Sequence, residues 1–302
     1  MNETGSPRPA AVMPIAWAGS AEADRSPVRG FFTLREGGVS AGPHGALDGR
    51  RGLNLGAACG DDPDAVAANR ARVVAAIGCP VRWLRQVHGA DVHDADARTD
   101  GGSAACDARA TPASPCRDAG DAEPRADAAF TTRTDLALAI QVADCLPVVV
   151  AAQDGSIVGV AHAGWRGLAG GVLEALVGRM RARRPGAELA AWLGPRIGPG
   201  AFEVGADVLD AFVSSNAQAR AAFTDAARAG KWYCDLGMLA TGQLRRLGID
   251  RTIDTRACTF ADATRFWSFR RDRACGRMAA IVALRAPAAR PAPRMRPRTP
   301  PV

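Results

Sequence analysis

The chain has 302 residues, of which 47% are hydrophobic and 23% are charged, and its formal net charge is +7. That length and apolar content are enough to bury a sizeable core, either in one domain with tails or in two domains. No apolar run approaches the roughly 18–20 residues of a membrane-spanning helix, and residues 1–27 lack the basic and apolar segments of a secretory signal, so we expect neither.

The first part of the chain is predicted to alternate short elements with long irregular segments. Asp62 and Pro63 are typical of a helix start, and Gly78 is typical of a helix end. Residues 99–124 have almost no bulky apolar side chains, so we expect a disordered insertion there. The predicted elements are, in order, a flexible extension at 1–27, a strand at Val28–Thr33, a glycine-rich loop at Arg35–Gly56, a helix from Asp61 to Gly78, and a strand at Val81–Val87.

The rest of the chain mixes strands and helices without a strict strand–helix–strand rhythm. This order favours a mixed sheet or an α+β sandwich over a doubly wound sheet. The predicted elements are a strand at Leu136–Val142, a hairpin of Pro147–Ala152 and Ile157–Ala161, a helix at Gly167–Arg183, a strand at Leu189–Leu193, helices near Val204–Val213 and Asp235–Leu247, and strands near Arg256–Phe260, Phe266–Arg270 and Arg277–Leu284.

The last segment, Arg285–Val302, accounts for most of the net positive charge. It holds five arginines and no acidic residue, which leaves the rest of the chain close to neutral. Its Pro/Arg-rich composition is typical of a disordered, solvated tail. We therefore expect a single catalytic domain at 28–284, with no membrane partner and no nucleic-acid partner, and the oligomeric state stays open.

Eight cysteines raise the question of disulfides. In a chain of this length with no expected secretory signal, we interpret most of them as reduced thiols of a cytoplasmic protein. No Cys-x-x-Cys pair is present, which argues against a zinc ribbon or a thioredoxin-type site.

Three potential metal ligands end three predicted strands. His88 precedes a glycine, Cys145 stands near Pro147, and His162 stands near Gly164. Two imidazoles and one thiolate suit Zn²⁺, and three protein ligands leave one position for water or substrate. The spacing alone is equally compatible with three separate, inert side chains.

The same residues also suit a different chemistry. Cys145 is a candidate thiolate nucleophile with His162 as its base, a role that competes with metal binding. Asp144 is a candidate acid–base group only if the strand bulges or ends there, because alternation points it to the opposite face. We leave His93 out of the site, since it is expected to face away, and we expect His44 at the surface.

Two arginines are candidate anion ligands. Arg166 lies in a glycine-rich turn that leads into the helix predicted at Gly167–Arg183, where free backbone amides bind phosphate. Arg35 lies in the glycine-rich loop. The alternative for each is an ordinary solvated arginine at the surface.

Taken together, the motifs resemble the laccase-domain, or YfiH-like, family from about residue 28 to residue 284. The segments Ala143–Pro147 and His162–Gly167 are the most specific of them. The resemblance rests on Gly37–Ser40, Leu53–Gly56, Gln86–Gly89, Ala143–Pro147, His162–Gly167, Trp192–Pro195, Ile197–Pro199, Phe202–Gly205 and Phe269–Asp272.

The resemblance implies a mixed β-sandwich flanked by helices and a zinc ion held by His88, Cys145 and His162. It also implies purine nucleoside phosphorylase activity on adenosine, inosine, guanosine and methylthioadenosine, with adenosine deaminase activity in the same site. Nucleosides and phosphate would then be the small-molecule partners. Our candidates for binding them are Arg35, Asn54 and Arg166, and those for catalysis are Cys145, His162 and Asp144.

The family has also been described as a polyphenol oxidase, and one branch is linked to editing of peptidoglycan precursors. A multicopper laccase needs about ten histidines, and this chain has four, so we reject laccase chemistry while leaving Cu²⁺ open as an alternative ion. The usual zinc-deaminase signature is absent, so deamination would need another acid–base group, with Asp144 the nearest candidate. The alternative functions are a zinc- or cysteine-dependent amidohydrolase acting on a cell-wall precursor, and a binding module with a structural metal.

Overall fold

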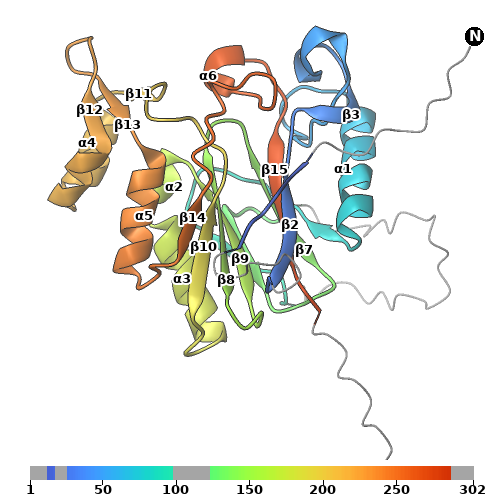
Figure 1. The fold of residues 1–302 in the computed structure, drawn as a ribbon, viewed down its shortest axis with the longest axis horizontal. Helices are drawn as coiled ribbons and strands as arrows, with labels where there is room; N and C mark the ends of the chain where they lie inside the picture. The colour runs from blue at the N-terminus through green and yellow to red at the C-terminus, as the bar shows by residue number, and fades with distance from the viewer. Residues whose placement is uncertain (1–11, 18–25, 98–122, 287–302) are drawn as a thin grey trace, which may run out of the picture.

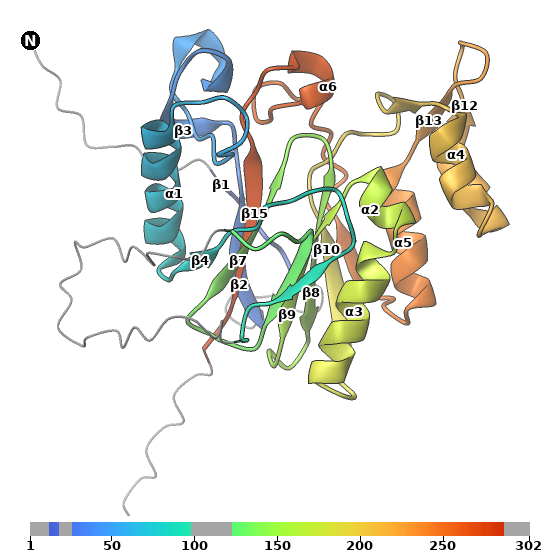
Figure 2. The ribbon, with the colours of Figure 1, turned by 180° about the vertical axis from the view of Figure 1, so that it is seen from behind.

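Two β-sheets stacked face to face form the centre of the molecule, and helices cover the outer face of each (Figures 1 and 2). The computed structural model describes residues 12–17, 26–97 and 123–286. The α+β sandwich expected from the sequence is confirmed, with parallel and antiparallel pairs in both sheets.

The first sheet has five strands in the order β1-β2-β15-β7-β4. Its central strand β15 is apolar along its whole length, because alternate residues enter two different core layers. Ala280 and Val282 face the second sheet, whereas Ile281 and Ala283 face helix α1. The strands are β1 (Val12–Pro14), β2 (Val28–Thr33), β4 (Val81–Arg82), β7 (Ala137–Val142) and β15 (Met278–Leu284).

The second sheet has six strands in the order β14-β10-β8-β9-β6-β5. The hairpin β8–β9 lies at its centre, and β8 is buried on both faces: Val149 packs toward the first sheet and Val148 toward the helices. The strands are β5 (Val92–Asp94), β6 (Ala128–Thr131), β8 (Leu146–Ala152), β9 (Val158–Ala163), β10 (Leu189–Leu193) and β14 (Thr252–Asp254).

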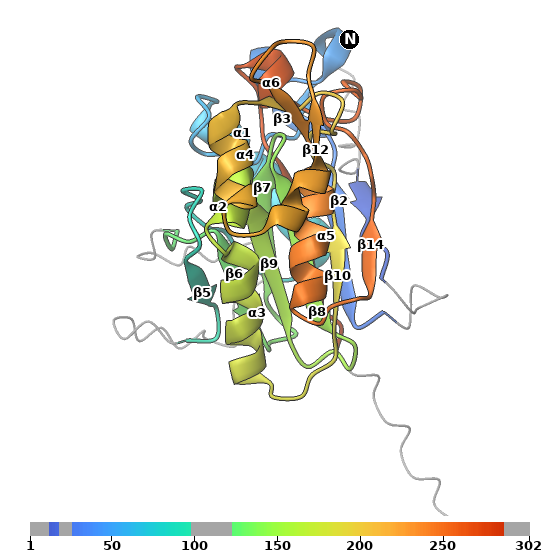
Figure 3. The ribbon, with the colours of Figure 1, turned by 90° about the vertical axis from the view of Figure 1, so that its left-hand side faces the viewer.

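Helix α1 covers the first sheet, and helices α3 and α5 lie beside each other over the second sheet (Figure 3). A small three-stranded sheet, in the order β11-β13-β12, forms with α4 a lobe at one side (Figure 1). The remaining elements are β3 (Glu36–Ser40), α1 (Pro63–Ile77), α2 (Trp165–Ala169), α3 (Val172–Arg183), β11 (Glu203–Val204), α4 (Ala206–Val213), β12 (Phe223–Asp225), β13 (Trp232–Cys234), α5 (Leu236–Arg246), α6 (Phe269–Asp272) and the 3₁₀ segments Gly42–His44, Leu47–Gly49 and Ala217–Ala222.

Several predicted elements differ from the structure. The helix expected at Gly167–Arg183 is two helices, because Gly171 adopts φ 82° between α2 and α3. The strand expected at Phe266–Arg270 is absent, since the Ser268 side chain caps the short helix α6. The strand expected at Val81–Val87 ends at Arg82.

The flexible extension expected at 1–27 is partly ordered. Residues Val12–Pro14 pair with β2, and the side chains of Ile15 and Trp17 are buried in the core between the two sheets. Most of the insertion expected at 99–124 lies outside the described residues, as does nearly all of the basic tail, whereas Glu123 forms an ion pair with Arg70. In the part of the chain that the structure describes, no helix has the length and apolarity to cross a bilayer.

The packing of α3 on β9 depends on a residue without a side chain. A Cβ at Gly159 would lie 2.7 Å from Met180 Sδ and 2.9 Å from Leu176 Cδ1. We expect Gly159→Val to lower the free energy of unfolding by about 1–3 kcal/mol through overpacking, although valine suits a strand. Gly178→Ala is the control: it lies on α3 with nothing within 4 Å of the new Cβ, and it should stabilise by about 0.5–1 kcal/mol. Urea unfolding measures both, and equal values for Gly159→Val and wild type would contradict this packing.

Candidate metal centre

The three predicted ligands lie together at one end of the sandwich. His88, Cys145 and His162 offer ligand atoms that all lie within 4.8 Å of one another. The ring centroids of the two histidines are 4.7 Å apart. His88 is exposed, Cys145 is partly exposed and His162 is buried, so the group closes on the protein side and opens toward solvent.

The hairpin β8–β9 places two of the ligands. Leu146 pairs with Ala163 across the hairpin, which sets Cys145 beside Gly164. A Cβ at Gly164 would lie 2.8 Å from Cys145 Sγ, so only glycine leaves room for the thiol at this position.

The third ligand is held by a segment that bridges the two sheets. The side-chain amide of Gln86 donates to Gln141 O and accepts from Gln141 N, each at 2.8 Å, and so continues the pairing of β4 with β7. His88 follows with φ 61°. This left-handed conformation is uncommon for a residue other than glycine, and it turns the chain toward the other ligands.

A carboxylate that the sequence analysis missed organises the centre. Asp127 is fully buried just before β6. Its oxygens accept from the backbone N–H groups of Val87, His88 and Gly89 at 2.7–3.2 Å and from His162 Nδ1 at 2.8 Å. Because Nδ1 donates to the carboxylate, Nε2 of His162 remains for an ion, as in the carboxylate–histidine–metal arrangement.

In the metal-free protein, the surroundings of Cys145, His162 and Asp127 favour the charged form of each side chain. Burial alone raises the pKa of a thiol, but the charge of His162 and hydrogen bonds from both histidines outweigh it and lower the pKa of Cys145 to about 6. Burial lowers the pKa of an imidazole, but the Cys145 thiolate and the Asp127 carboxylate raise the pKa of His162 to about 9. Burial opposes ionisation of Asp127, yet the bonds from His162 and from the backbone N–H groups of Gly89 and Val87 lower its pKa.

A cavity of about 600 Å³ opens over the centre, and we call it the metal-centre cavity. All three ligands line it, together with Asp144 and Arg166. The lining also includes three aromatic residues and four further arginines, which offer ring surfaces and positive charge to a ligand. They are Trp165, Phe202, Phe269, Arg85, Arg270, Arg273 and Arg277.

Of the predicted substrate-binding residues, the structure brings only Arg166 to this cavity. Arg35 is buried, donates to Gly45 O at 3.1 Å, and is not part of the lining. Asn54 is also buried, and its side chain bonds Gly56 and Asp61. The helix that follows the glycine-rich turn at Gly164 is shorter than expected, since α2 has only five residues.

Asp144, His44 and His93 differ in how they lie relative to the cavity. Asp144 lines the cavity with φ 96°, but its two oxygens already accept from Thr259 Oγ1 at 2.6 Å and Arg270 N at 2.7 Å. His44, expected at the surface, is buried, and its Nε2 donates to Cys59 O at 3.0 Å. His93 lies in β5 and, as expected, is not part of the ligand group.

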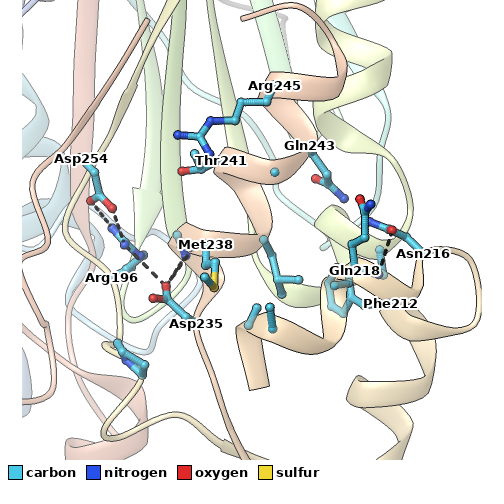
Figure 4. Close-up of a pocket in the computed structure, with 18 of the residues that line it drawn as sticks. Arg196, Phe212, Asn216, Gln218, Asp235, Met238, Thr241, Gln243, Arg245 and Asp254 are labelled. Carbon is cyan, nitrogen blue, oxygen red and sulfur yellow. Dashed lines mark hydrogen bonds and ion pairs between the residues drawn. The ribbon is translucent and has the colours of Figure 1, made fainter. Parts of the chain in front are cut away.

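A second cavity, of about 900 Å³, lies between α5 and the Ala217–Ala222 segment and contains none of the predicted site residues. Its buried cation Arg196 is neutralised: Figure 4 shows it between Asp254, at 2.7 and 2.8 Å, and Asp235, at 3.8 Å. Arg196 therefore links β14 to the start of α5, and its role is structural.

Comparison with known proteins identifies relatives over nearly the whole described domain. Residues 29–285 match the family described as multi-copper polyphenol oxidoreductase laccase. A purine nucleoside phosphorylase of Pseudomonas aeruginosa is 42% identical over 255 residues, covering 84% of this chain and 93% of its own length. The purine nucleoside phosphorylase YfiH of Escherichia coli is 39% identical over 252 residues, covering 83% and 91%.

Solved structures agree with the fold. A Neisseria meningitidis protein superposes with a TM-score of 0.76 at 37% identity, covering 91% of this chain and 99% of its own. YlmD from Geobacillus stearothermophilus gives a TM-score of 0.72 at 27% identity, covering 91% and 100%.

Asp127 should control metal affinity. We expect Asp127→Asn to weaken Zn²⁺ binding roughly 10–100-fold. The amide keeps one acceptor oxygen, but its NH₂ group takes the place of an oxygen that now accepts N–H groups, which disturbs the bonds that orient both histidines. Competition with a chromophoric chelator measures the affinity. Asp96→Asn is the matched control: Asp96 also accepts several hydrogen bonds that lower its pKa, but it is not part of the ligand group. A similar loss in both variants would mean that Asp127 acts only on folding.

The thiol of Cys145 should titrate unusually low in metal-free protein. Its pKa of about 6 lies below the ordinary value near 8.5, so thiolate is present at neutral pH and disappears only as the pH falls through about 6. We expect the rate of iodoacetamide alkylation of the Cys145 peptide, followed by mass spectrometry, to have its midpoint near pH 6. Adding Zn²⁺ should suppress the reaction. A midpoint above pH 8 would contradict the thiolate–imidazolium pairing.

Proposed function

The chain belongs to the multi-copper polyphenol oxidoreductase laccase family, and we propose that it acts as a metal-dependent purine nucleoside phosphorylase. The observation that carries the proposal is the convergence of His88, Cys145 and His162 under a cavity that is lined by arginines and aromatic rings. Relatives at 36–44% identity are named purine nucleoside phosphorylases, which supports this choice of reaction.

The cavity suits both parts of a nucleoside and a phosphate. Its volume of about 600 Å³ falls within the range of about 300–1,000 Å³ that is usual for small-molecule sites. The exposed ring of Phe269 and the partly buried rings of Trp165 and Phe202 offer stacking surfaces for a purine. The guanidinium of Arg166 stacks on Trp165 and reaches the same space, where it would bind phosphate.

In phosphorolysis, an oxygen of phosphate forms a bond to C1′ of the ribose while the bond from C1′ to the purine breaks. The electron pair of that bond leaves with the purine, which takes up a proton, and ribose 1-phosphate is the other product. The arginines hold the phosphate anion beside C1′, and the aromatic rings fix the base, so the protein supplies orientation and charge stabilisation.

The donor set fits zinc. Two imidazole nitrogens and one thiolate, with Asp127 orienting His162, correspond to a three-ligand catalytic zinc site. When bound, Zn²⁺ supplies a Lewis acid with one coordination position free for a ligand. Cu²⁺ is the alternative ion that the family description names, but the four histidines are too few for the several copper centres of a laccase.

The motif resemblance extends the proposal to particular substrates. These are adenosine, inosine, guanosine and methylthioadenosine, with deamination of adenosine in the same cavity. The six cysteines within the described residues are all free thiols, which supports a reducing compartment, and we place the enzyme in the cytoplasm.

The decisive experiment incubates Zn²⁺-loaded protein with adenosine, with and without phosphate. We expect release of adenine and ribose 1-phosphate only with phosphate, and inosine or hypoxanthine if deamination also occurs. His88→Ala should abolish base release, whereas His93→Ala, a histidine outside the cavity lining, should retain it. Chromatography identifies the products.

Two outcomes would contradict this function. Base release that is independent of phosphate would indicate hydrolysis of the nucleoside. Absence of base release together with phosphate-independent cleavage of an amide in a peptidoglycan precursor would favour the amidohydrolase alternative.

A further inference from the structure

The metal-centre cavity carries more positive charge than its own lining neutralises. Two of its five arginines, Arg270 and Arg277, donate to backbone carbonyls. Within the described residues, the side chains of Arg85, Arg166 and Arg273 have no hydrogen-bond or ion-pair partner. These three guanidinium groups remain for a ligand.

The acidic residues of the lining do not compensate this charge. Glu123 is paired with Arg70 at 2.6 Å. Asp144 accepts from Thr259 Oγ1 and from the backbone N–H of Arg270. An anionic ligand would therefore meet unpaired guanidinium groups and no free carboxylate.

Arg273 differs from the other two unpaired arginines in its backbone. It follows α6 with φ 59° and ψ −69°, a strained conformation for any residue with a side chain. The side chain is exposed, so core packing does not account for the strain. His88 and Asp144, which line the same cavity, also have positive φ, and strained residues of this kind cluster at ligand sites.

Asp144 connects this strained turn to the metal centre. It adjoins Cys145 in the chain, and its carboxylate accepts the backbone N–H of Arg270 at 2.7 Å. The α6 segment is thereby anchored one residue away from a metal ligand. This contact gives Asp144 a structural task in place of the acid–base role considered from the sequence.

We propose that Arg273 binds the inorganic phosphate co-substrate and that Asp144 is a positioning residue that holds α6, and with it Arg273, against the metal centre. The inference rests on the proposed phosphorolysis. A guanidinium group donates two parallel hydrogen bonds to phosphate oxygens, and that of Arg273 lines the cavity without a partner among the described residues. Arg273 thus has the phosphate-binding role for which the sequence analysis had considered Arg35.

Steady-state kinetics with varied phosphate test the assignment. We expect Arg273→Gln to raise KM for phosphate roughly 10–100-fold, the loss typical of a charged hydrogen bond, with KM for the nucleoside changed less than about twofold. Arg256→Gln is the matched control, because Arg256 is an exposed arginine with φ 51° that lines the second cavity. Its KM for phosphate should equal that of wild type.

Arg273→Gly separates binding from folding. Glycine accepts a positive φ without strain, so this variant should unfold at the same or a higher denaturant concentration than wild type while KM for phosphate still rises. A variant that is less stable than wild type would mean that Arg273 supports the fold, and would overturn the inference.

Asp144 is tested by its coupling to Arg273. Asp144→Asn should raise KM for phosphate in wild type and have little further effect in the Arg273→Gln background, since it acts through the same residue. Zn²⁺ content, measured in each variant, should not change. Full additivity of the two substitutions would overturn the positioning role.

Direct binding distinguishes a failure of this inference from a failure of the proposed function. Phosphate alone should raise the melting temperature of wild type and of Arg256→Gln but not of Arg273→Gln, whether or not nucleosides react. Phosphorolysis with an unchanged KM for phosphate in Arg273→Gln would overturn the inference and leave the function intact. If Arg273 instead made adenosine 5′-monophosphate bind tighter than adenosine, it would serve a substrate phosphate, and the assignment to the co-substrate would be wrong.

Discussion

The buried carboxylate of Asp127 ties together segments that lie far apart in the sequence, and the geometry of the centre depends on it. It collects three backbone N–H groups from Val87 to Gly89 and the ring N–H of His162. A buried carboxylate is costly unless its oxygens are hydrogen-bonded, so the same bonds that stabilise Asp127 fix both histidine ligands. Removing it would release His88 and His162 together.

Residues with strained backbone conformations gather around the same centre. Three of the positive-φ residues in the described ranges, His88, Asp144 and Arg273, surround one cavity. Each such residue costs about 1–3 kcal/mol and persists only where its surroundings impose it. Here those surroundings are the carboxylate of Asp127, the hairpin β8–β9 and the capped turn of α6, all backed by strands that are buried on both faces.

Two kinds of feature were predictable from the sequence: strands that are buried on both faces, and a site marked by rare residue types. Fully apolar runs such as Leu189–Leu193 coincide with strands because both of their faces are buried. The few histidines at strand ends indicated two members of the group that could hold a metal ion. Asp127 was not predictable in this way, because no local pattern distinguishes it from the other aspartates as the one that folding would bury. The strain at Arg273 was equally hidden, since it arises from contacts with distant residues.

The predicted substrate residues Arg35 and Asn54 have a role that the structure makes clear. Both brace the segment that carries α6: Arg35 lies 3.9 Å from Asp272 and packs its guanidinium over Trp267, while Asn54 Oδ1 accepts from Arg277 N at 2.7 Å. Asp144 holds the same segment from the side of the metal ligand. The glycine-rich loop, the strand end at Cys145 and the α6 turn therefore form one supporting framework. Arg35 and Asn54 do not line the cavity, yet they help to determine where Arg273 lies.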